Sequence, residues 1–335
     1  MTNAATSPSE GGEEQYLVGE APAFLIVESV RKTAEDVLLI RFGPEQGEEL
    51  PEWRPGAHID LVLPSGRVRA YSLCSDPTDR AHYEIAVLKE RDSLGGSVEL
   101  HETPLVGLRL GYIGPRNHFE LVAAPAYFFL VGGIGVTPIL SMLRDVDRRH
   151  ATWHCLYAGR NAASMAFLEE VGAFGSEHVT ILYEDEAGRP DVAALFSSLD
   201  AGTVVYCCGP AGMLRAAEAA SWRIGTRSLH LERFHPTPVP PSVMSFGSEF
   251  DVRLEREGVV LHVPRDRSVL SVVREVLAKV PSSCGSGSCG VCETRVLSGE
   301  IDHRDRVLSA EECERGDVMM ICVSRAKSGL LVLDL

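Results

Sequence analysis

The stretch CGSGSCGVC, residues 284–292, places three thiols within nine residues, and Val291 is its only larger apolar side chain. Four cysteines form a C-x4-C-x2-C…C pattern: Cys284, Cys289, Cys292 and Cys322. This is the plant-type spacing of thiolates around a [2Fe-2S] cluster. Glycines in such a loop permit unusual φ values and let backbone N–H groups approach the sulfurs. The pattern therefore predicts an iron–sulfur loop.

Two other interpretations of these thiols are a structural zinc site and disulfides. Zinc sites usually pair their ligands in two short C-x2-C-like steps, whereas Cys322 stands alone. Disulfides are rare in reducing compartments, and the polar opening MTNAATSPSEGGEEQ does not resemble a secretory signal. We therefore expect a cytoplasmic protein with reduced thiols. Four further cysteines are expected to be ordinary thiols: Cys74, Cys155, Cys207 and Cys313.

The composition narrows the classes of partner. The 335 residues carry 32 basic and 47 acidic side chains, which gives a formal charge of -15. This charge argues against nucleic acid or an anionic membrane as a partner, and a solvated acidic surface explains it. The most apolar run, residues 123–140, contains two prolines and three glycines, so it favours a buried strand and helix start over a membrane span.

Hydrophobic patterning divides the chain. Residues 1–21 are polar and are expected to be disordered. Residues 22–122 hold short alternating or β-branched runs bounded by Gly, Pro or Asp, which indicate an antiparallel β-barrel. Residues 123–234 alternate between strand and helix patterns, which indicates a parallel α/β domain.

The remaining chain forms a third unit. Four prolines without periodicity mark residues 235–249 as a linker. Residues 250–335 begin with a hairpin pattern, continue with an amphipathic helix pattern over 268–280, and then contain the cysteine loop. Three domains are therefore expected.

Two loops in the α/β segment indicate a nucleotide site. GGIGVTP, residues 132–138, follows a strand pattern, with Thr137 expected as the N-cap and Pro138 as the first helical residue. Backbone N–H groups there can hold a pyrophosphate, although G-x-G-x-x-P is equally compatible with a tight structural turn. CCGP, residues 207–210, also joins a strand to a helix. Two such loops at one sheet edge are typical of a nucleotide crevice.

The barrel segment carries two short polar motifs. Residues 69–72, RAYS, place a guanidinium, a phenol and a hydroxyl on one strand. Arg suits a phosphate, Tyr suits a flavin ring, and Ser can reach a ring nitrogen, although a solvated strand has the same letters. Residues 94–97, LGGS, precede a helix pattern and offer a second anion site.

These motifs in this order resemble the phthalate dioxygenase reductase family, reductase components of Rieske oxygenases within the ferredoxin–NADP reductase superfamily. The tail segments GEIDHRDRVLSAEE and MICVSRAKSGLLVLDL add to the resemblance, which covers about residues 22–335. It implies an FMN-binding β-barrel, an NAD-binding α/β domain and a C-terminal plant-type ferredoxin domain of the α+β, β-grasp class.

The resemblance also implies residue roles. FMN would be bound by Arg69, Ala70, Tyr71, Ser72, Ala86, Val87, Leu88, Gly95, Gly96, Ser97, Thr137 and Phe234. NADH would be bound by Gly133, Arg160, Cys208, Gly209 and Pro210. The cluster would be held by Cys284, Cys289, Cys292 and Cys322. Ser72, near flavin N5, and Cys208, near the nicotinamide, would lie at the reacting atoms, and Arg69 at the FMN phosphate.

Three positions depart from the family pattern. Leu88 and Leu94 stand where members often carry basic residues, so the FMN phosphate is expected to be anchored differently. Gly285 replaces a larger, often polar residue and would expose the cluster.

Two pairs of residues beside the motifs also have expected roles. His58 and His101 are expected to be structural, because hydride passes directly from nicotinamide to flavin. Acidic Glu184 and Asp185 follow the strand pattern VTILY, where they would repel a 2′-phosphate and favour NADH over NADPH.

The sequence thus predicts a monomeric electron relay. NADH would reduce FMN, and electrons would pass singly through the [2Fe-2S] cluster to a separate Rieske-type oxygenase, because a flavin can serve both a hydride donor and a one-electron cluster. The alternatives are a flavoenzyme that reduces a low-molecular-weight acceptor directly, and a zinc-stabilised binding protein without electron output.

Overall fold

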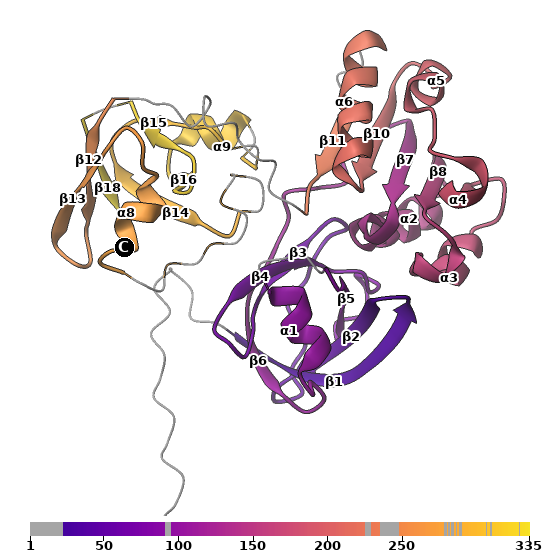
Figure 1. Cartoon of the computed structure of the whole chain (residues 1–335), viewed down its shortest axis with the longest axis horizontal. Coiled ribbons are helices and arrows are strands. Elements are labelled where there is room, and N and C mark those ends of the chain that lie inside the picture. Colours follow the sequence, from indigo (N-terminus) through magenta and orange to yellow (C-terminus); the bar gives the residue numbers. More distant parts are fainter. Residues whose placement is uncertain are drawn as a thin grey trace, which may run out of the picture.

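The chain forms three bodies in the computed structural model (Figure 1). A strand-rich N-terminal body, an α/β body and a C-terminal body follow one another along the sequence. The structure describes residues 23–90, 95–224, 229–234, 248–277, 280, 282, 285, 287, 290–305, 307–308, 310–327 and 329–335. The predicted disordered start and most of the predicted linker lie outside these ranges.

The N-terminal body is a six-stranded antiparallel sheet in the order β4-β3-β6-β1-β2-β5. The strands are β1 Ala23–Ala34, β2 Val37–Pro44, β3 His58–Val62, β4 Val68–Ser72, β5 Tyr83–Leu88 and β6 Arg109–Arg116. Strand β6 was not expected, because the glycines and proline of RLGYIGPR interrupt its alternation. A bridge between Leu73 and Ile85 joins the two edge strands β4 and β5 and closes the barrel.

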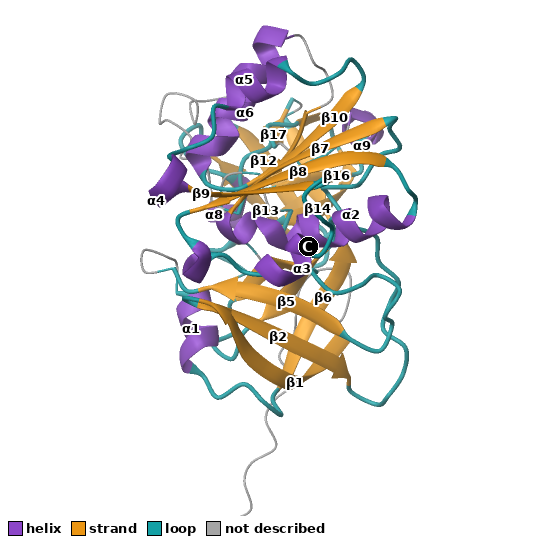
Figure 2. Ribbon diagram, turned by 90° about the vertical axis from the view of Figure 1, so that its right-hand side faces the viewer, coloured by secondary structure: helices purple, strands orange, loops and turns teal. Residues whose placement is uncertain are grey.

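The second body contains a parallel sheet in the order β11-β10-β7-β8-β9. Its strands are β7 Ala126–Gly132, β8 Thr152–Gly159, β9 Val179–Tyr183, β10 Thr203–Cys208 and β11 Leu229–Glu232. Its helices are α2 Val136–Arg148, α3 Leu168–Gly172, α4 Glu184–Ala187, α5 Val192–Ser197 and α6 Ala211–Ile224. Helices α2 and α3 cover one face and α5 and α6 the other (Figure 2). This confirms the predicted parallel α/β domain.

The predicted N-cap in this domain was wrong. Residues Gly133–Gly135 form a 3-10 turn that continues directly into α2, so the helix begins at Val136 with Gly135 in the capping position. Thr137 lies inside the first turn, where its hydroxyl donates to the carbonyl oxygen of Ile134 at 3.1 Å. A side chain engaged in this way cannot cap the helix.

The C-terminal body is a mixed sheet in the order β13-β12-β18-β14-β16, with a separate β15-β17 pair. The elements are β12 Phe250–Leu254, β13 Val259–Val263, α8 Val269–Val273, β14 Glu293–Ser298, β15 Ile301–Asp302, α9 Ala310–Arg315, β16 Val318–Met320, β17 Arg325–Ala326 and β18 Leu330–Leu333. The expected hairpin is β12–β13. Helix α8 is shorter than expected, since the chain leaves helical geometry after Arg274 and Val276 is exposed.

None of the helices in the described part of the chain has the length and apolar character that a membrane span requires.

Candidate redox site

The predicted flavin residues gather where the barrel closes. Strands β4 and β5 are the two edges of the sheet, and they meet through the Leu73–Ile85 bridge. Residues 69–72 lie on β4 and 86–88 on β5, so the structure brings these two predicted groups together. Burial raises the pKa of Tyr71, which keeps its phenol neutral. His101 contacts the carbonyl oxygen of Val87 at 2.9 Å through a ring nitrogen, a structural role.

The predicted phosphate turn lies against Arg69. Gly95 has a φ of 88° and caps helix α1, Gly96–Glu102. A Cβ on Gly96 would lie 2.8 Å from Cγ of Arg69, so only glycine lets the arginine side chain pass this closely. The Ser97 hydroxyl accepts a hydrogen bond from the Glu90 amide at 3.2 Å. Leu94 and the cation Arg91 lie outside the described residues.

A second arginine, which the sequence analysis did not single out, lies at the same turn. A Cβ on Gly95 would be 3.7 Å from Nη1 of Arg67. Arg67 pairs with Glu99 of α1 at 3.2 Å. Since Leu88 supplies no cation, Arg67 and Arg69 are the basic residues placed here by the described β4 strand and its preceding turn. The residues present therefore fit a flavin phosphate.

The two predicted nucleotide loops are in direct backbone contact. A Cβ on Gly135 would lie 2.3 Å from the carbonyl oxygen of Cys208, and one on Gly209 would lie 2.9 Å from Cα of Gly132. Strands β7 and β10 are parallel neighbours, and Val131 pairs with Cys208 at their ends. Pro210 packs on Gly132, where a Cβ would be 2.5 Å from its Cδ. The predicted shared sheet edge is therefore present.

Further residues that were predicted to contact NADH or FMN lie along the same edge of the parallel sheet. Arg160 follows β8 and is exposed, and its carbonyl oxygen accepts from the Asp185 amide at 3.1 Å. Glu184 and Asp185 open the short helix α4, so the acidic pair stands beside Arg160 at the strand ends. Phe234 follows β11 and is 41% exposed, which leaves its ring available to cover a ligand. Gly133 has a φ of 52° in the turn that opens α2.

A carboxylate that the sequence analysis missed connects the two domains. Glu232 pairs with Cys208 in the β10–β11 register, and its Oε2 accepts from the Ser72 hydroxyl at 3.5 Å, the long limit of a hydrogen bond. Burial raises the pKa of Glu232 to about 8. Burial also raises the pKa of Cys208 well above its ordinary value, and Glu232 adds to this. The sequence signal that could have indicated this role is the acidic residue at the end of β11, two positions before Phe234.

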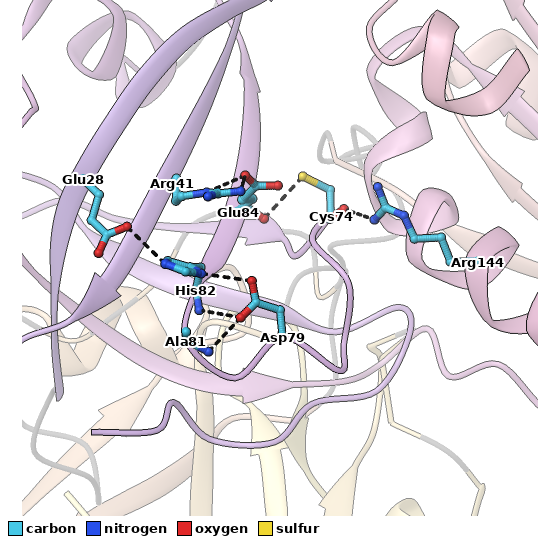
Figure 3. Close-up of polar contacts among 8 residues, drawn as sticks. All are labelled: Glu28, Arg41, Cys74, Asp79, Ala81, His82, Glu84 and Arg144. Carbon is cyan, nitrogen blue, oxygen red and sulfur yellow. Dashed lines mark hydrogen bonds and ion pairs between the residues drawn. The ribbon is translucent and has the colours of Figure 1, made fainter. Parts of the chain in front are cut away.

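The barrel and the α/β domain are also tied along helix α2. Arg144 of α2 donates to the carbonyl oxygen of Cys74 at 2.6 Å (Figure 3). The Cys74 thiol contacts the carbonyl oxygen of Glu84, whose carboxylate pairs with Arg41 at 2.9 Å. Further along α2, Arg148 pairs with Asp76 at 2.9 Å. These contacts fix helix α2, which begins at the predicted nucleotide loop, onto the segment that follows strand β4.

Two of the four predicted cluster ligands are described. Cys292 and Cys322 are both buried, and the Ile321 amide donates to the Cys292 carbonyl oxygen at 3.4 Å, so the two ligands come from adjoining backbone. Gly287 and Gly290 have φ values of 69° and 77°, as the loop requires. Cys284 and Cys289 lie outside the described residues; within them, no set of three His, Cys, Asp or Glu side chains is placed to hold a metal. The buried thiols and the left-handed glycines fit a cluster loop.

The cluster loop packs against the barrel. Val291 shares a buried apolar cluster with Val62 and Val68, and Ala70 packs against it. A Cβ on Gly290 would lie 2.8 Å from Nε2 of His118, which follows β6. Strand β4, called the flavin strand below because it carries the predicted FMN contacts 69–72, therefore has the nucleotide domain at its Ser72 end and the cluster loop at its Val68 end.

Comparisons with known proteins agree with this arrangement. Residues 252–327 match the 2Fe-2S iron-sulfur cluster binding domain family, and residues 129–219 match the oxidoreductase NAD-binding domain family. The tert-butanol monooxygenase / tert-amyl alcohol desaturase reductase subunit of Aquincola tertiaricarbonis is 40% identical over 308 residues, 88% of this chain and 90% of that protein. The phthalate dioxygenase reductase of Burkholderia cepacia is 36% identical over 319 residues, 93% of this chain and 97% of that protein.

Solved structures show the same architecture. A crystal structure of an intact type IV self-sufficient cytochrome P450 monooxygenase matches 96% of this chain with a TM-score of 0.85 and 38% identity. This chain spans only 43% of that protein's length. A structure of phthalate dioxygenase reductase, described as a modular structure for electron transfer from pyridine nucleotides to [2Fe-2S], matches 94% of this chain and 98% of its own, with a TM-score of 0.67 and 35% identity.

The fold and the site define a flavin-dependent pyridine-nucleotide oxidoreductase with a fused plant-type ferredoxin domain. The chain belongs to the phthalate dioxygenase reductase family, and its cofactors are FMN, NADH and a [2Fe-2S] cluster. When bound, a flavin accepts a hydride and releases electrons one at a time, as a cluster requires. The residues described above are the predicted contacts of these groups, and they lie where the three domains meet.

Proposed function

We propose that this protein carries electrons from NADH through FMN and its [2Fe-2S] cluster to a Rieske-type terminal oxygenase, as a monomer in the cytoplasm. One observation carries the proposal, the position of strand β4 between the two other domains. Ser72 at one end contacts Glu232 of the nucleotide domain, and Val68 at the other contacts Val291 of the cluster loop. A flavin on this strand would be close to both the hydride donor and the cluster.

The residue roles follow from this placement. Arg69, with Arg67 beside it, would hold the FMN phosphate, and Ser72 would face the reacting edge of the ring. Thr137 and Phe234 would enclose the flavin from the nucleotide domain. The Gly133 turn, Arg160 and the Cys208-Gly209-Pro210 turn would hold NADH. All four cysteines of the C-x4-C-x2-C…C pattern would bind the cluster.

The names of relatives support an oxygenase as the acceptor. One relative is named as the reductase subunit of a tert-butanol monooxygenase, and one from Escherichia coli, 37% identical over 317 residues, as a carnitine monooxygenase reductase subunit. Separate reductase subunits imply separate oxygenase components. The self-sufficient P450 carries a similar unit within a longer chain, so a haem protein is the other acceptor to test.

An anaerobic titration with NADH tests the proposal first. We expect the flavin and iron–sulfur absorption bands both to bleach, and the reduced protein then to reduce an added Rieske oxygenase but not a P450 haem domain. The Cys289→Ser variant should lose cytochrome c reduction while it keeps NADH-to-ferricyanide activity. An intact cluster that stays oxidised while the flavin bleaches would overturn the relay, and reduction of the haem alone would overturn the Rieske assignment.

A second function, direct reduction of a small acceptor, is favoured by one relative. The protein named tetrachlorobenzoquinone reductase from Sphingobium chlorophenolicum is 36% identical over 320 residues, 93% of this chain. If the flavin itself reduces a quinone, the Cys289→Ser variant will retain full NADH-dependent quinone reduction. Loss of quinone reduction in that variant would mean that electrons leave the protein from the cluster and not from the flavin.

A further inference from the structure

Val291 is the one larger apolar residue in a loop otherwise built from Gly, Ser and Cys, and it does not point to solvent. Val291 is 4% exposed and lies in a buried cluster with Val62 of β3 and Val68 of β4. These two partners face each other in the β3–β4 register. A residue between the last two cysteines of the cluster loop is therefore buried in the outer surface of another domain.

The surface that receives Val291 is one face of the β3–β4 hairpin. On β3, Ile59 and Leu61 belong to the barrel core, so His58, Asp60 and Val62 point to the opposite face. Their partners across the register are Ser72, Ala70 and Val68. This face therefore has its apolar end under Val291 and its polar end at Ser72, the predicted flavin contact.

Contacts beside Val291 fix the loop laterally. Gly290, with a φ of 77°, lies so close to His118 that a Cβ would be 2.8 Å from Nε2. The imidazole of His118 lies 5.5 Å from that of His58, centroid to centroid. Arg116 pairs with the buried carboxylate of Asp60 at 3.1 Å. Two imidazoles and an ion pair thus border the valine contact.

We propose that Val291 is a positioning residue that seats the cluster loop on the flavin strand and so sets the rate of electron transfer from flavin to cluster. The inference rests on the proposed function, since it needs both groups in place. Burying a valine favours the seated arrangement by about tenfold or more over a separated one. An aspartate at 291 would have to be buried without a partner, so it would favour separation.

The test compares Val291→Asp with Val260→Asp, because Val260 is a valine of the same domain that is 58% exposed on β13. In anaerobic stopped-flow measurements without any oxygenase, we expect NADH to reduce the flavin at the wild-type rate in both variants. Subsequent cluster reduction should slow at least about tenfold in Val291→Asp only. Small-angle X-ray scattering should show a larger radius of gyration for that variant, and its cluster EPR spectrum should show a fully assembled cluster.

Two further variants separate seating from cluster assembly. Val62→Asp changes the barrel side and leaves the cysteine loop intact, so it should reproduce the slow cluster reduction with a fully loaded cluster. Val291→Ile keeps the apolar contact and should retain the wild-type rate. A wild-type rate of cluster reduction in Val291→Asp and Val62→Asp would overturn the positioning role. If the cluster of the wild-type protein is not reduced by its own flavin, the proposed function fails instead.

Discussion

Arg144 on helix α2 donates a 2.6 Å hydrogen bond to the carbonyl oxygen of Cys74, just beyond the flavin strand. The same helix begins at the turn that is expected to hold the NADH pyrophosphate. One side chain therefore connects the position of the nucleotide loop to the position of the flavin strand. The alignment of hydride donor and acceptor is sensitive to geometry of this kind.

We expect Arg144→Met to destabilise the contact between the barrel and the α/β domain by about 1–3 kcal/mol, because a charge-assisted bond to a partly buried carbonyl is lost. Arg148→Met is the control, since its ion pair with Asp76 is 42% and 41% exposed and is worth less than about 1 kcal/mol. Thermal release of flavin fluorescence measures stability, and stopped-flow measures flavin reduction. Equal behaviour of the two variants would contradict a specific role for Arg144.

Glu232 should make stability depend on pH. Burial raises its pKa from the ordinary value of 4.5 to about 8 in the folded protein. Between these values the unfolded chain has released the proton and the folded protein still binds it, so stability falls as pH rises from about 4.5 to about 8. The Glu232→Gln variant should show a flatter profile over this window by thermal unfolding. If the wild type and Glu232→Gln lose stability in parallel over this pH window, the pKa of Glu232 is not raised in the folded protein.

Gly135→Ala should disrupt the nucleotide crevice. A Cβ there would lie 2.3 Å from a backbone oxygen of Cys208, which cannot move aside as a flexible side chain can. We expect a loss of about 1–3 kcal/mol in stability and a higher KM for NADH. Gly212→Ala on α6 is the matched control, because among the described residues no atom beyond its chain neighbours and its own helix backbone lies within 4 Å of its Cβ position. That control should be neutral or more stable by up to about 1 kcal/mol.

The two arginines at the glycine turn should differ in their effect on FMN binding. Arg69→Gln removes a cation that packs directly on Gly96, and we expect FMN affinity to fall about 10- to 100-fold by fluorescence titration. Arg67→Gln should have a smaller effect, since Arg67 is 51% exposed and already pairs with Glu99. The opposite ranking would identify Arg67 as the phosphate anchor.

Local patterns in the sequence predicted most of the architecture. Alternating apolar and polar residues predicted the barrel strands on which Arg69 and Leu88 lie. The repeated order of strand, loop and helix predicted both turns at the edge of the parallel sheet. These signals are strong because each depends on residues close together in the chain. Strand β6 was missed because its glycines and proline hide the alternation, and Thr137 was misplaced because a 3-10 turn extends the helix start.

Contacts between domains could not be predicted in the same way. Glu232 meets Ser72 only because β11 ends beside the barrel, 160 positions further along the chain. Val291 meets Val62 and Val68 through the docking of one domain on another, and nothing near it in sequence indicates that surface. The sequence marked the valine as unusual in its loop, but its partner became visible only in three dimensions.

The described residues of the cluster loop differ in their exposure. Gly290 and Val291 are buried against the barrel, whereas Gly285 is exposed, and among the described residues no atom beyond its chain neighbours lies within 4 Å of its Cβ position. An acceptor that docks beside Gly285 would leave the contact between Val291 and the barrel undisturbed. The complex could then persist while both electrons of one hydride leave in turn, so delivery would be processive within a single encounter.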